Sequence, residues 1–313
     1  MAVIRVMEPG LFTTVQDLGR EGYGSMGVSP SGAADAVSLR IGNRLVGNGE
    51  GAAGLEMTLL GGTFEFPDGV VLALAGSDFG ATLDGKPAEL WATFEAKAGQ
   101  VLKMGPTRTG ARCYLSVQGG IEVKAFLGSA STHISSGLGG VEGRALRKGD
   151  VLKTGAASGS ARQRRLSARA LKELEPRRVL RVTPGSQSEW FSEAAKRLFY
   201  AGRYGVAEES NRMGIRLKGE AALQTPGGEM ISEGVSLGAI QVPEGGQPII
   251  LFVEQQTTGG YPTIANVISA DFHSLGQLRP RDEVRFERVD WETARNLLRE
   301  QEEILASEER LFA

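Results

Sequence analysis

The sequence predicts a mainly β protein in two like halves, with a few helices and a helix at the C-terminal end. Glycine is abundant, at 44 of 313 residues, whereas aromatic residues make up 6%, which indicates many tight turns between short strands. Segments rich in β-branched residues recur between turn residues, as in GVVLALAG, CYLSVQGGI, VLRVTPG and DEVRFERV. Two pairs of similar segments also occur in the same order, which indicates an internal duplication.

The duplication is indicated by the spacing of these two pairs. RIGNRL begins at Arg40 and RMGIRL at Arg212, an offset of 212 − 40 = 172. FEFPDGVVLALAG begins at Phe64 and IQVPEGGQPIILFVE at Ile240, an offset of 240 − 64 = 176. We therefore predict an N-terminal β domain over residues 1–155, a linker over 156–176, a C-terminal β domain over 177–289 and a C-terminal helix over 290–313.

Helical spacing of apolar residues occurs in a few places. It predicts a helix within residues 31–48, a second helix that begins at a Ser188 cap, and a terminal helix that begins at an Asp290 cap. The terminal helix has an apolar stripe that starts at Trp291 and reaches Leu305. The predicted linker is polar and locally basic, which favours a solvated surface over an RNA site.

Composition limits the partners. The net charge of −2 gives no general reason to expect nucleic acid or an anionic membrane surface as a partner. No apolar run approaches about 18 residues, and no apolar leader follows Met1, so we expect a cytoplasmic protein. The lone cysteine, Cys113, lies in a strand-like segment, where a small buried side chain is expected rather than a nucleophile.

Two familiar motifs are incomplete. The segment Gly80–Pro87 nearly matches a phosphate-binding loop, but Pro87 stands where a magnesium-binding hydroxyl belongs, and Asp84-Gly85 favours a hairpin turn. His133 and His273 are far apart and have no metal-type spacing, so we expect no metal site. Ser131-Thr132-His133 is not a catalytic triad, and we predict a surface turn there.

One polar loop follows a strand that is otherwise apolar. After Pro248–Val253 the sequence continues EQQTTGGYP, which has more amide and hydroxyl side chains than a connection requires. Such side chains both donate and accept hydrogen bonds and suit a neutral amide-like ligand. The alternative is that they satisfy buried backbone groups. We predict a ligand site formed by Asn211, Arg212, Gln241, Gln256, Thr257, Thr258 and Tyr261, with Glu254 as base or orienting group.

Several segments in this order resemble the allophanate hydrolase subunit 2 family: TVQDLGREGYGSMGVSPSGAAD, RIGNRLVGN, VQGGI, LGSAST, NRMGIRL and QTTGGYP. This family includes biotin-dependent carboxyltransferase components, the C subunit of bacterial 5-oxoprolinase and the sporulation kinase-inhibitor antagonist. The resemblance implies two cyclophilin-like β-barrel domains. It also implies partners: a subunit 1-type, kinase-inhibitor-like protein and a lactam-utilisation-type subunit.

Three functions are consistent with this resemblance. The first is a subunit of an ATP-dependent 5-oxoprolinase, which converts 5-oxo-L-proline to L-glutamate with ATP bound by partner subunits and no cofactor bound by this chain. The second is a biotin-dependent carboxyltransferase component that acts on a urea or amide substrate. The third is a non-catalytic regulator of a partner. The sequence departs from the family pattern at Ala130, Ser186 and Glu254-Gln255, which removes two arginines that could bind an anionic group.

Overall fold

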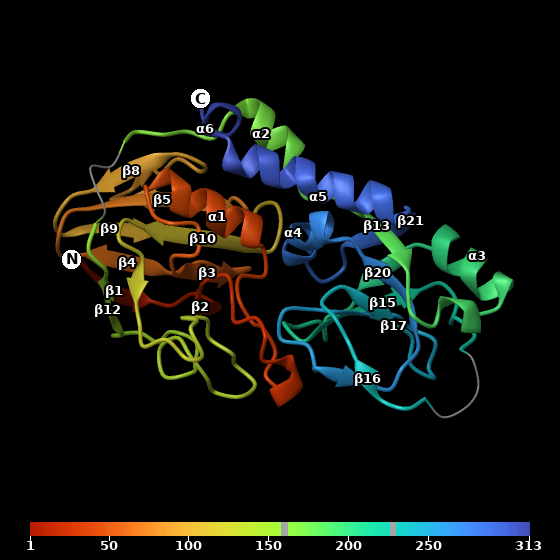
Figure 1. Ribbon diagram of the computed structural model, residues 1–313. Helices are drawn as coiled ribbons and strands as arrows, with labels where there is room; N and C mark the ends of the chain where they lie inside the picture. Colours follow the sequence, from red (N-terminus) through yellow and green to blue (C-terminus); the bar gives the residue numbers. More distant parts are fainter. Residues whose placement is uncertain (158–161, 226–229) are drawn as a thin grey trace. The chain divides into compact units, whose positions relative to one another are not determined.

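The computed structural model describes residues 1–157, 162–225 and 230–313, which divide into two compact units (Figure 1). The first unit comprises residues 1–20, 31–174 and 304–313, and the second comprises 21–30 and 175–303. The segment predicted as a linker, 156–176, contains α2 (Ala168–Glu173), and its residues 158–161 lie outside the described residues. Ala170 of α2 is fully buried in a cluster of the first unit.

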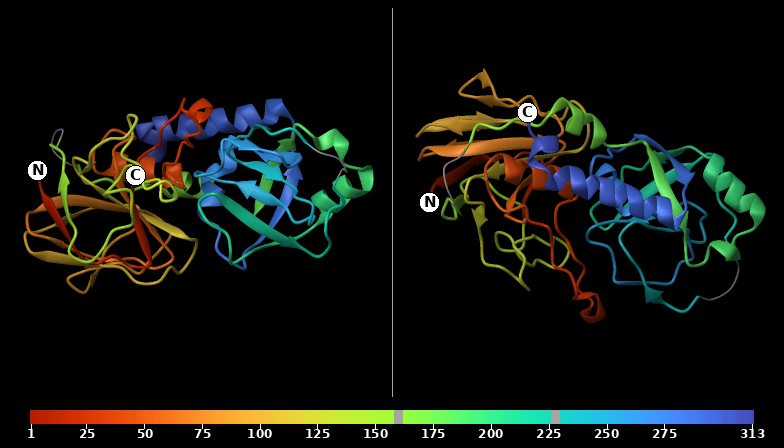
Figure 2. Two further views of the ribbon diagram at one scale, coloured as in Figure 1. Left: turned by 90° about the horizontal axis from the view of Figure 1, so that it is seen from below. Right: turned by 45° about the horizontal axis from the view of Figure 1, so that its top comes forward.

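The first unit contains two antiparallel sheets (Figures 1 and 2). One sheet has the strand order β11-β12-β1-β4-β9-β6-β7 and the other has the order β2-β3-β10-β5-β8. The strands of the first sheet are β1 (Val3–Glu8), β4 (Thr63–Phe66), β6 (Thr82–Leu83), β7 (Lys86–Pro87), β9 (Gln100–Lys103), β11 (Ile121–Glu122) and β12 (Val151–Thr154). Those of the second are β2 (Phe12–Gln16), β3 (Gly54–Thr58), β5 (Val70–Gly76), β8 (Thr93–Ala96) and β10 (Arg112–Val117).

Both sheets contribute to one apolar core. Ile4 and Val6 alternate inward from β1, and they share the core with Leu55 and Leu115 of the second sheet. All residues of β10 are buried, because the core lies on one face and α1 (Ala36–Leu45) packs on the other. This helix begins at Asp35, whose side chain accepts a hydrogen bond from the backbone N–H of Ser38, so the predicted helix within 31–48 is confirmed.

Two other predictions for the first unit are confirmed. Asp84 and Gly85 have positive φ angles of 48° and 79° and connect the paired strands β6 and β7, as expected of a hairpin turn with two left-handed residues. Residues 80–87 therefore form a hairpin. Cys113 is fully buried on β10, and burial raises the pKa of its thiol far above the usual value.

The second unit contains a closed barrel with the strand order β13-β20-β17-β18-β15-β14-β21. Closure is made by β13 and β21, which pair in parallel, whereas the other pairs are antiparallel (Figure 2, left). The strands are β13 (Val179–Pro184), β14 (Tyr204–Val206), β15 (Gly214–Gly219), β17 (Ala239–Gln241), β18 (Ile249–Leu251), β20 (Thr263–Val267) and β21 (Glu283–Arg288). The mainly β class with few helices is thus confirmed, and the barrel lies in this unit.

Helix α3 (Glu193–Ala201) packs on β21 of the barrel. Its buried residues are Ala195 and Phe199, and the ring of Phe199 stacks on Phe286 with centroids 4.6 Å apart. The predicted start at Ser188 is wrong. Ser192 caps the helix by accepting from the N–H of Ala195, because residues Ser188–Trp190 form a separate short 3-10 helix, η2.

The C-terminal helix α5 (Trp291–Ala306) is confirmed, and the N–H of Thr293 donates to Asp290 Oδ1 over 2.7 Å. Its predicted apolar stripe is wrong at the N-terminal end, where Trp291 is 69% exposed. Leu305 is fully buried in a cluster of the first unit. The remaining elements are η1 (Gly24–Met26), β16 (Glu233–Gly234), β19 (Thr258–Gly259), η3 (Ser269–Asp271), α4 (Phe272–Gly276) and α6 (Glu308–Leu311).

The paired segments behind the predicted duplication differ in structure. RIGNRL lies in α1, whereas most of RMGIRL lies in strand β15. In the second pair, β17 and β18 are hydrogen-bonded neighbours, but β4 and β5 belong to different sheets. The similar segments RIGNRL and RMGIRL, 172 residues apart, therefore do not have the same structure. The first forms a helix and most of the second forms a strand.

Among the described residues, no helix is long and apolar enough to cross a membrane.

Candidate functional site

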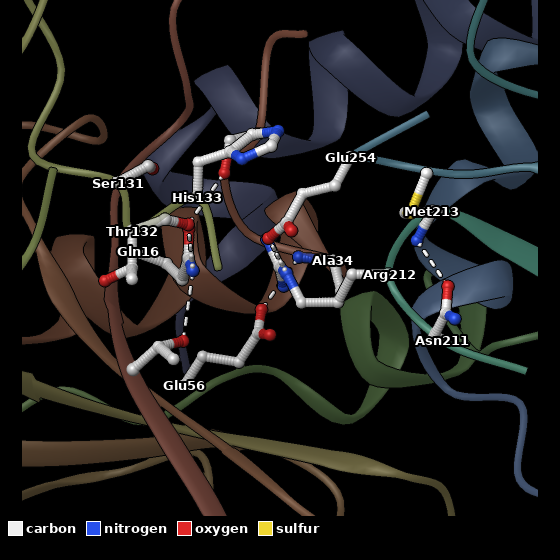
Figure 3. A network of polar contacts seen from close by, with 12 residues as sticks. Gln16, Ala34, Glu56, Ser131, Thr132, His133, Asn211, Arg212, Met213 and Glu254 are labelled. Atoms are coloured by element: carbon white, nitrogen blue, oxygen red, sulfur yellow. Dashed lines mark hydrogen bonds and ion pairs between the residues drawn. The ribbon is translucent and has the colours of Figure 1, made fainter. Parts of the chain in front are cut away.

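A buried ion pair lies at the start of the polar loop predicted as a ligand site. Backbone pairing continues beyond β18: the N–H of Phe252 donates to Met213 O, and the N–H of Glu254 donates to Arg212 O over 2.8 Å. This pairing brings the side chains of Arg212 and Glu254 together, with Arg212 Nε donating to Glu254 Oε1 over 2.5 Å (Figure 3). Their side chains are only 7% and 2% exposed.

The pair limits what Glu254 can do. A guanidinium that donates directly to a buried carboxylate occupies one of its oxygens and fixes its position. We therefore favour the orienting role that the sequence left open for Glu254 over proton abstraction. The predicted neighbours Arg212 and Glu254 do come together, and the backbone hydrogen bonds explain why.

The glycine pair of the loop permits a close approach of two amide side chains. Strand β19 pairs with β16, with Gly259 opposite Glu233. A Cβ atom on Gly259 would lie 2.6 Å from Gln241 Nε2 and 2.8 Å from Gln256 Nε2. Both amide groups therefore face the Gly259 backbone, and Gln241 Nε2 also donates to Tyr261 O over 3.2 Å. A side chain at residue 259 would displace them.

Three side chains of the loop remain available to a ligand. Gln256 and Thr258 are exposed and Thr257 is half-buried. In the part of the chain that the structure describes, none of these three side chains has a hydrogen-bond partner within the protein. A loop that served only to satisfy buried backbone groups would use these donors and acceptors internally. Their freedom supports the ligand interpretation.

The other two predicted site residues differ in position. Tyr261 is 46% exposed, at the edge of the loop, where its ring can border a ligand. Asn211 is exposed, and its Oδ1 accepts hydrogen bonds from the N–H groups of Met213 and Gly214 (Figure 3). This is a turn-forming role, so only the Nδ2 group of Asn211 is left to face a ligand.

Two buried glutamines of the second unit were missed as site residues. Gln187 accepts from the N–H of Thr263 over 3.1 Å and donates to Glu233 over 2.9 Å, so it ties β20 to the β16 strand. Gln255 is 5% exposed, and its Oε1 has no hydrogen-bond partner among the described residues. Unpartnered buried carbonyl oxygens are uncommon. The only sequence signal was that Gln255 departs from the family pattern.

The first unit contains a second polar cluster, which corrects the prediction of a surface turn at residues 131–133. Ser131 and Thr132 are fully buried and His133 is 7% exposed. The carboxylate of Asp17 explains this, because Oδ1 accepts from Ser129 Oγ over 2.6 Å and from Ser131 Oγ over 2.5 Å. Its two oxygens also accept from the N–H groups of Gly19 and Ala130.

Neighbouring buried groups extend this cluster. Gln16 Nε2 donates to Thr14 Oγ1 and to Thr132 O, while Gln16 Oε1 has no partner among the described residues (Figure 3). Glu56 is fully buried, and its Oε2 accepts from the Ala34 N–H over 2.8 Å and from Tyr114 Oη over 2.7 Å. Gln16, Ala34 and Thr132 lie in segments that carry the family resemblance, which was the available signal, whereas Glu56 lies outside them.

The polar loop carries amide and hydroxyl side chains. No group of three or more histidine, cysteine, aspartate or glutamate side chains placed to bind a metal occurs within the described ranges. The amides and hydroxyls of the loop, together with the buried Arg212–Glu254 pair beside it, can bind and orient a neutral planar group.

Comparison with known proteins gives a consistent result. The sequence matches the family described as "Carboxyltransferase domain, subdomain A and B" over residues 26–288. It is 38% identical to the C subunit of 5-oxoprolinase from Escherichia coli over 93% of each chain. It is 36% identical to the C subunit of 5-oxoprolinase from Haemophilus influenzae over 96% of each chain.

Larger proteins contain a similar region. Urea amidolyase of Saccharomyces cerevisiae is 33% identical over 97% of this chain, which spans 18% of that protein. The structure of urea amidolyase from K. lactis superposes with a TM-score of 0.88 at 30% identity, covering 99% of this chain and 20% of that one. The urea carboxylase structure from Kluyveromyces lactis gives the same TM-score of 0.88, at 32% identity and with 30% of that chain covered.

Proposed function

Because the chain belongs to the carboxyltransferase domain family with subdomains A and B, we propose that it is the C subunit of a 5-oxoprolinase. Such a complex opens the lactam of 5-oxo-L-proline to give L-glutamate. One observation carries the proposal: the matches to the C subunits of 5-oxoprolinase cover 93–96% of both chains, whereas the chain spans less than a fifth of the yeast urea amidolyase. The proposed complex is cytoplasmic.

In this proposal the chain binds substrate and partner subunits use ATP. A subunit 1-type protein and a lactam-utilisation-type protein would complete the complex. The observation that favours this division is that residues 80–87, the nearest match to a phosphate-binding loop, form a hairpin instead. ATP hydrolysis would then supply the free energy for opening the lactam, while the loop side chains position it.

The residues of the second unit suit a lactam. Its N–H group needs an acceptor and its C=O group needs a donor, and Gln256, Thr257 and Thr258 can supply both. Gln241 lies against Gly259 at the base of the loop, and Tyr261 would border the ligand. Glu254, fixed by Arg212, would orient the bound lactam. Gln255 offers one more acceptor through its free Oε1.

The first prediction tests the loop itself. Thr257→Ala removes one hydrogen bond to an uncharged ligand group, so we expect affinity for 5-oxoproline to fall roughly two- to twelve-fold. The melting temperature should stay nearly unchanged, because the Thr257 side chain has no hydrogen bond within the described protein. Isothermal titration calorimetry on the assembled complex measures the affinity. Thr82→Ala, a half-buried threonine on β6, is the control. Normal affinity together with a large loss of stability would mean that Thr257 is structural.

A second prediction concerns the isolated chain, which should hydrolyse no ATP whether or not 5-oxoproline is present. Phosphate release from the purified chain is the measurement. Steady release that a single substitution in this chain abolishes would contradict the proposed division of labour.

Urea amidolyase and urea carboxylase relatives support a second candidate, a carboxyltransferase component for a urea or amide substrate. Biotin would be the carboxyl carrier in that reaction, and it would be attached to another protein. The uncharged donors and acceptors of Gln256, Thr257 and Thr258 fit its ureido ring as well as they fit a lactam. Carboxyl-transfer assays with N-carboxybiotin as the donor and urea as the acceptor, which should yield carboxylated urea and free biotin, separate the two candidates. The third candidate is a regulator that takes no part in catalysis. Full 5-oxoprolinase activity of the partner subunits without this chain would favour it.

A further inference from the structure

A cavity in the first unit is lined by arginines that the proposed function does not use. It has a volume of about 320 Å³ and lies at the C-terminal end of α1, with Arg44, Asn48, Arg162, Arg164 and Glu308 in its wall. A cavity of this size accommodates a small ligand. None of these residues belongs to the loop proposed above as the lactam site.

Two of the arginines are held in fixed positions. Arg44 and Arg164 have side chains only 12% and 19% exposed. Their guanidinium carbons lie 5.6 Å and 5.0 Å from the centroid of the Phe312 ring. Arg164 Nη1 also donates to Arg44 O over 2.8 Å. Because these side chains are already ordered, a ligand would bind them without a large cost in conformational entropy.

The charges around the cavity do not balance. The residues that line the cavity are three arginines and one carboxylate, a formal charge of 3 − 1 = +2, and Glu50 behind Arg44 is balanced by Arg40. Glu308 accepts from Arg164 Nη2 over 3.0 Å and from Arg44 Nη2 over 3.4 Å. Arg44 Nη1 also lies 3.6 Å from Glu50 Oε1, but Glu50 is shared with Arg40. The Glu308 side chain is 59% exposed. A ligand with two negative charges can displace it at small cost, because the freed carboxylate remains solvated.

Arg162 adds a third cation at the rim. It is exposed, and it has no ion pair with any residue that the structure describes. Asn48 is already engaged, since its Oδ1 accepts from Gly119 and its Nδ2 donates to Val117 O. Recognition therefore depends on the guanidinium groups, whose planar donors match the oxygens of a phosphate.

We propose that this cavity is a binding site for a phosphate group, either inorganic phosphate or the phosphate of a small monoester. The phosphate oxygens accept from Arg44 and Arg164 in place of Glu308, and Arg162 closes on the exposed side. Arg44 belongs to α1, and Arg164 packs on Phe312 near the C-terminal end of the chain. A phosphate bound to both arginines therefore links α1 to the C-terminal residues.

Isothermal titration calorimetry at constant ionic strength measures how tightly the full chain binds inorganic phosphate and glycerol 3-phosphate. Sulfate is titrated as a third ligand for comparison. We expect Arg164→Gln to weaken phosphate binding at least about tenfold, because it removes a charged donor. Arg165→Gln is the matched control, since Arg165 is the adjacent residue and pairs with Glu89 outside the cavity. It should leave binding unchanged.

Glu308→Gln provides a test in the opposite direction. It removes the competing carboxylate, so phosphate should bind about three- to tenfold more tightly. Tighter binding of glycerol 3-phosphate than of phosphate identifies a monoester as the ligand, and the reverse order identifies free phosphate. Equal losses in Arg164→Gln and Arg165→Gln would overturn the proposal. So would an unchanged affinity in Glu308→Gln, or equal millimolar binding of sulfate and phosphate, which means an adventitious ion only.

Discussion

Replacing Arg212 with methionine should lower the free energy of unfolding of the second unit by about 3–5 kcal/mol, the usual cost of leaving one member of a buried ion pair without its partner. Glu254 would remain with its side chain 2% exposed and without the guanidinium that donates to it. Methionine preserves most of the side-chain volume, so the loss reports on charge rather than on packing. Urea unfolding followed by circular dichroism measures it.

Arg203→Met is the matched control. Arg203 pairs with Glu283 over 3.4 Å, but both side chains are more than half exposed, so we expect a change of at most about 1 kcal/mol. If Arg212→Met is as stable as Arg203→Met, the buried pair is not a structural element of the barrel. The double variant Arg212→Met with Glu254→Gln should recover part of the lost stability, because it removes the uncompensated charge.

Asp17→Ala is the second substitution with a large expected effect, about 3–5 kcal/mol in the first unit. The carboxylate accepts from two buried hydroxyls and two partly buried backbone N–H groups, and all four donors would lose this acceptor. Each buried donor without a partner costs about 1–3 kcal/mol, although the costs are not additive. Urea unfolding again gives the magnitude.

Asp68→Ala controls for the loss of an acidic side chain. Asp68 is exposed and accepts one hydrogen bond, from the N–H of Val3, so its replacement should cost less than about 1 kcal/mol. A loss of similar size in both variants would show that the Asp17 cluster does not stabilise the first unit beyond an ordinary surface contact.

The local patterns that were predicted correctly depend on neighbouring residues alone. A helix forms within residues 31–48, Asp290 caps α5, and Asp84-Gly85 makes a hairpin, and each of these follows from side-chain or backbone preferences within a few positions. The start of α3 was misplaced by four residues because Ser188 and Ser192 are both acceptable caps. Only tertiary context selects between them.

The clusters that were missed depend on contacts between distant segments. Ser131 lies 114 positions from Asp17, and nothing near Ser131 in the sequence shows that its hydroxyl reaches a buried carboxylate. Arg212 and Glu254, 42 positions apart, were placed in one predicted site because they lie in the same half, but the ion pair between them was not predicted. The similar segments RIGNRL and RMGIRL were misleading, since tertiary context decides whether six such residues form a helix or a strand.

The most direct test of the proposed function is reconstitution. The chain is mixed with a subunit 1-type protein and a lactam-utilisation-type protein from the same source, and formation of L-glutamate from 5-oxo-L-proline and ATP is measured. We expect product only when all three proteins are present, and a reduced rate at low substrate concentration when the chain bears Thr257→Ala. Full activity of the two partners without this chain would contradict its assignment as a 5-oxoprolinase subunit.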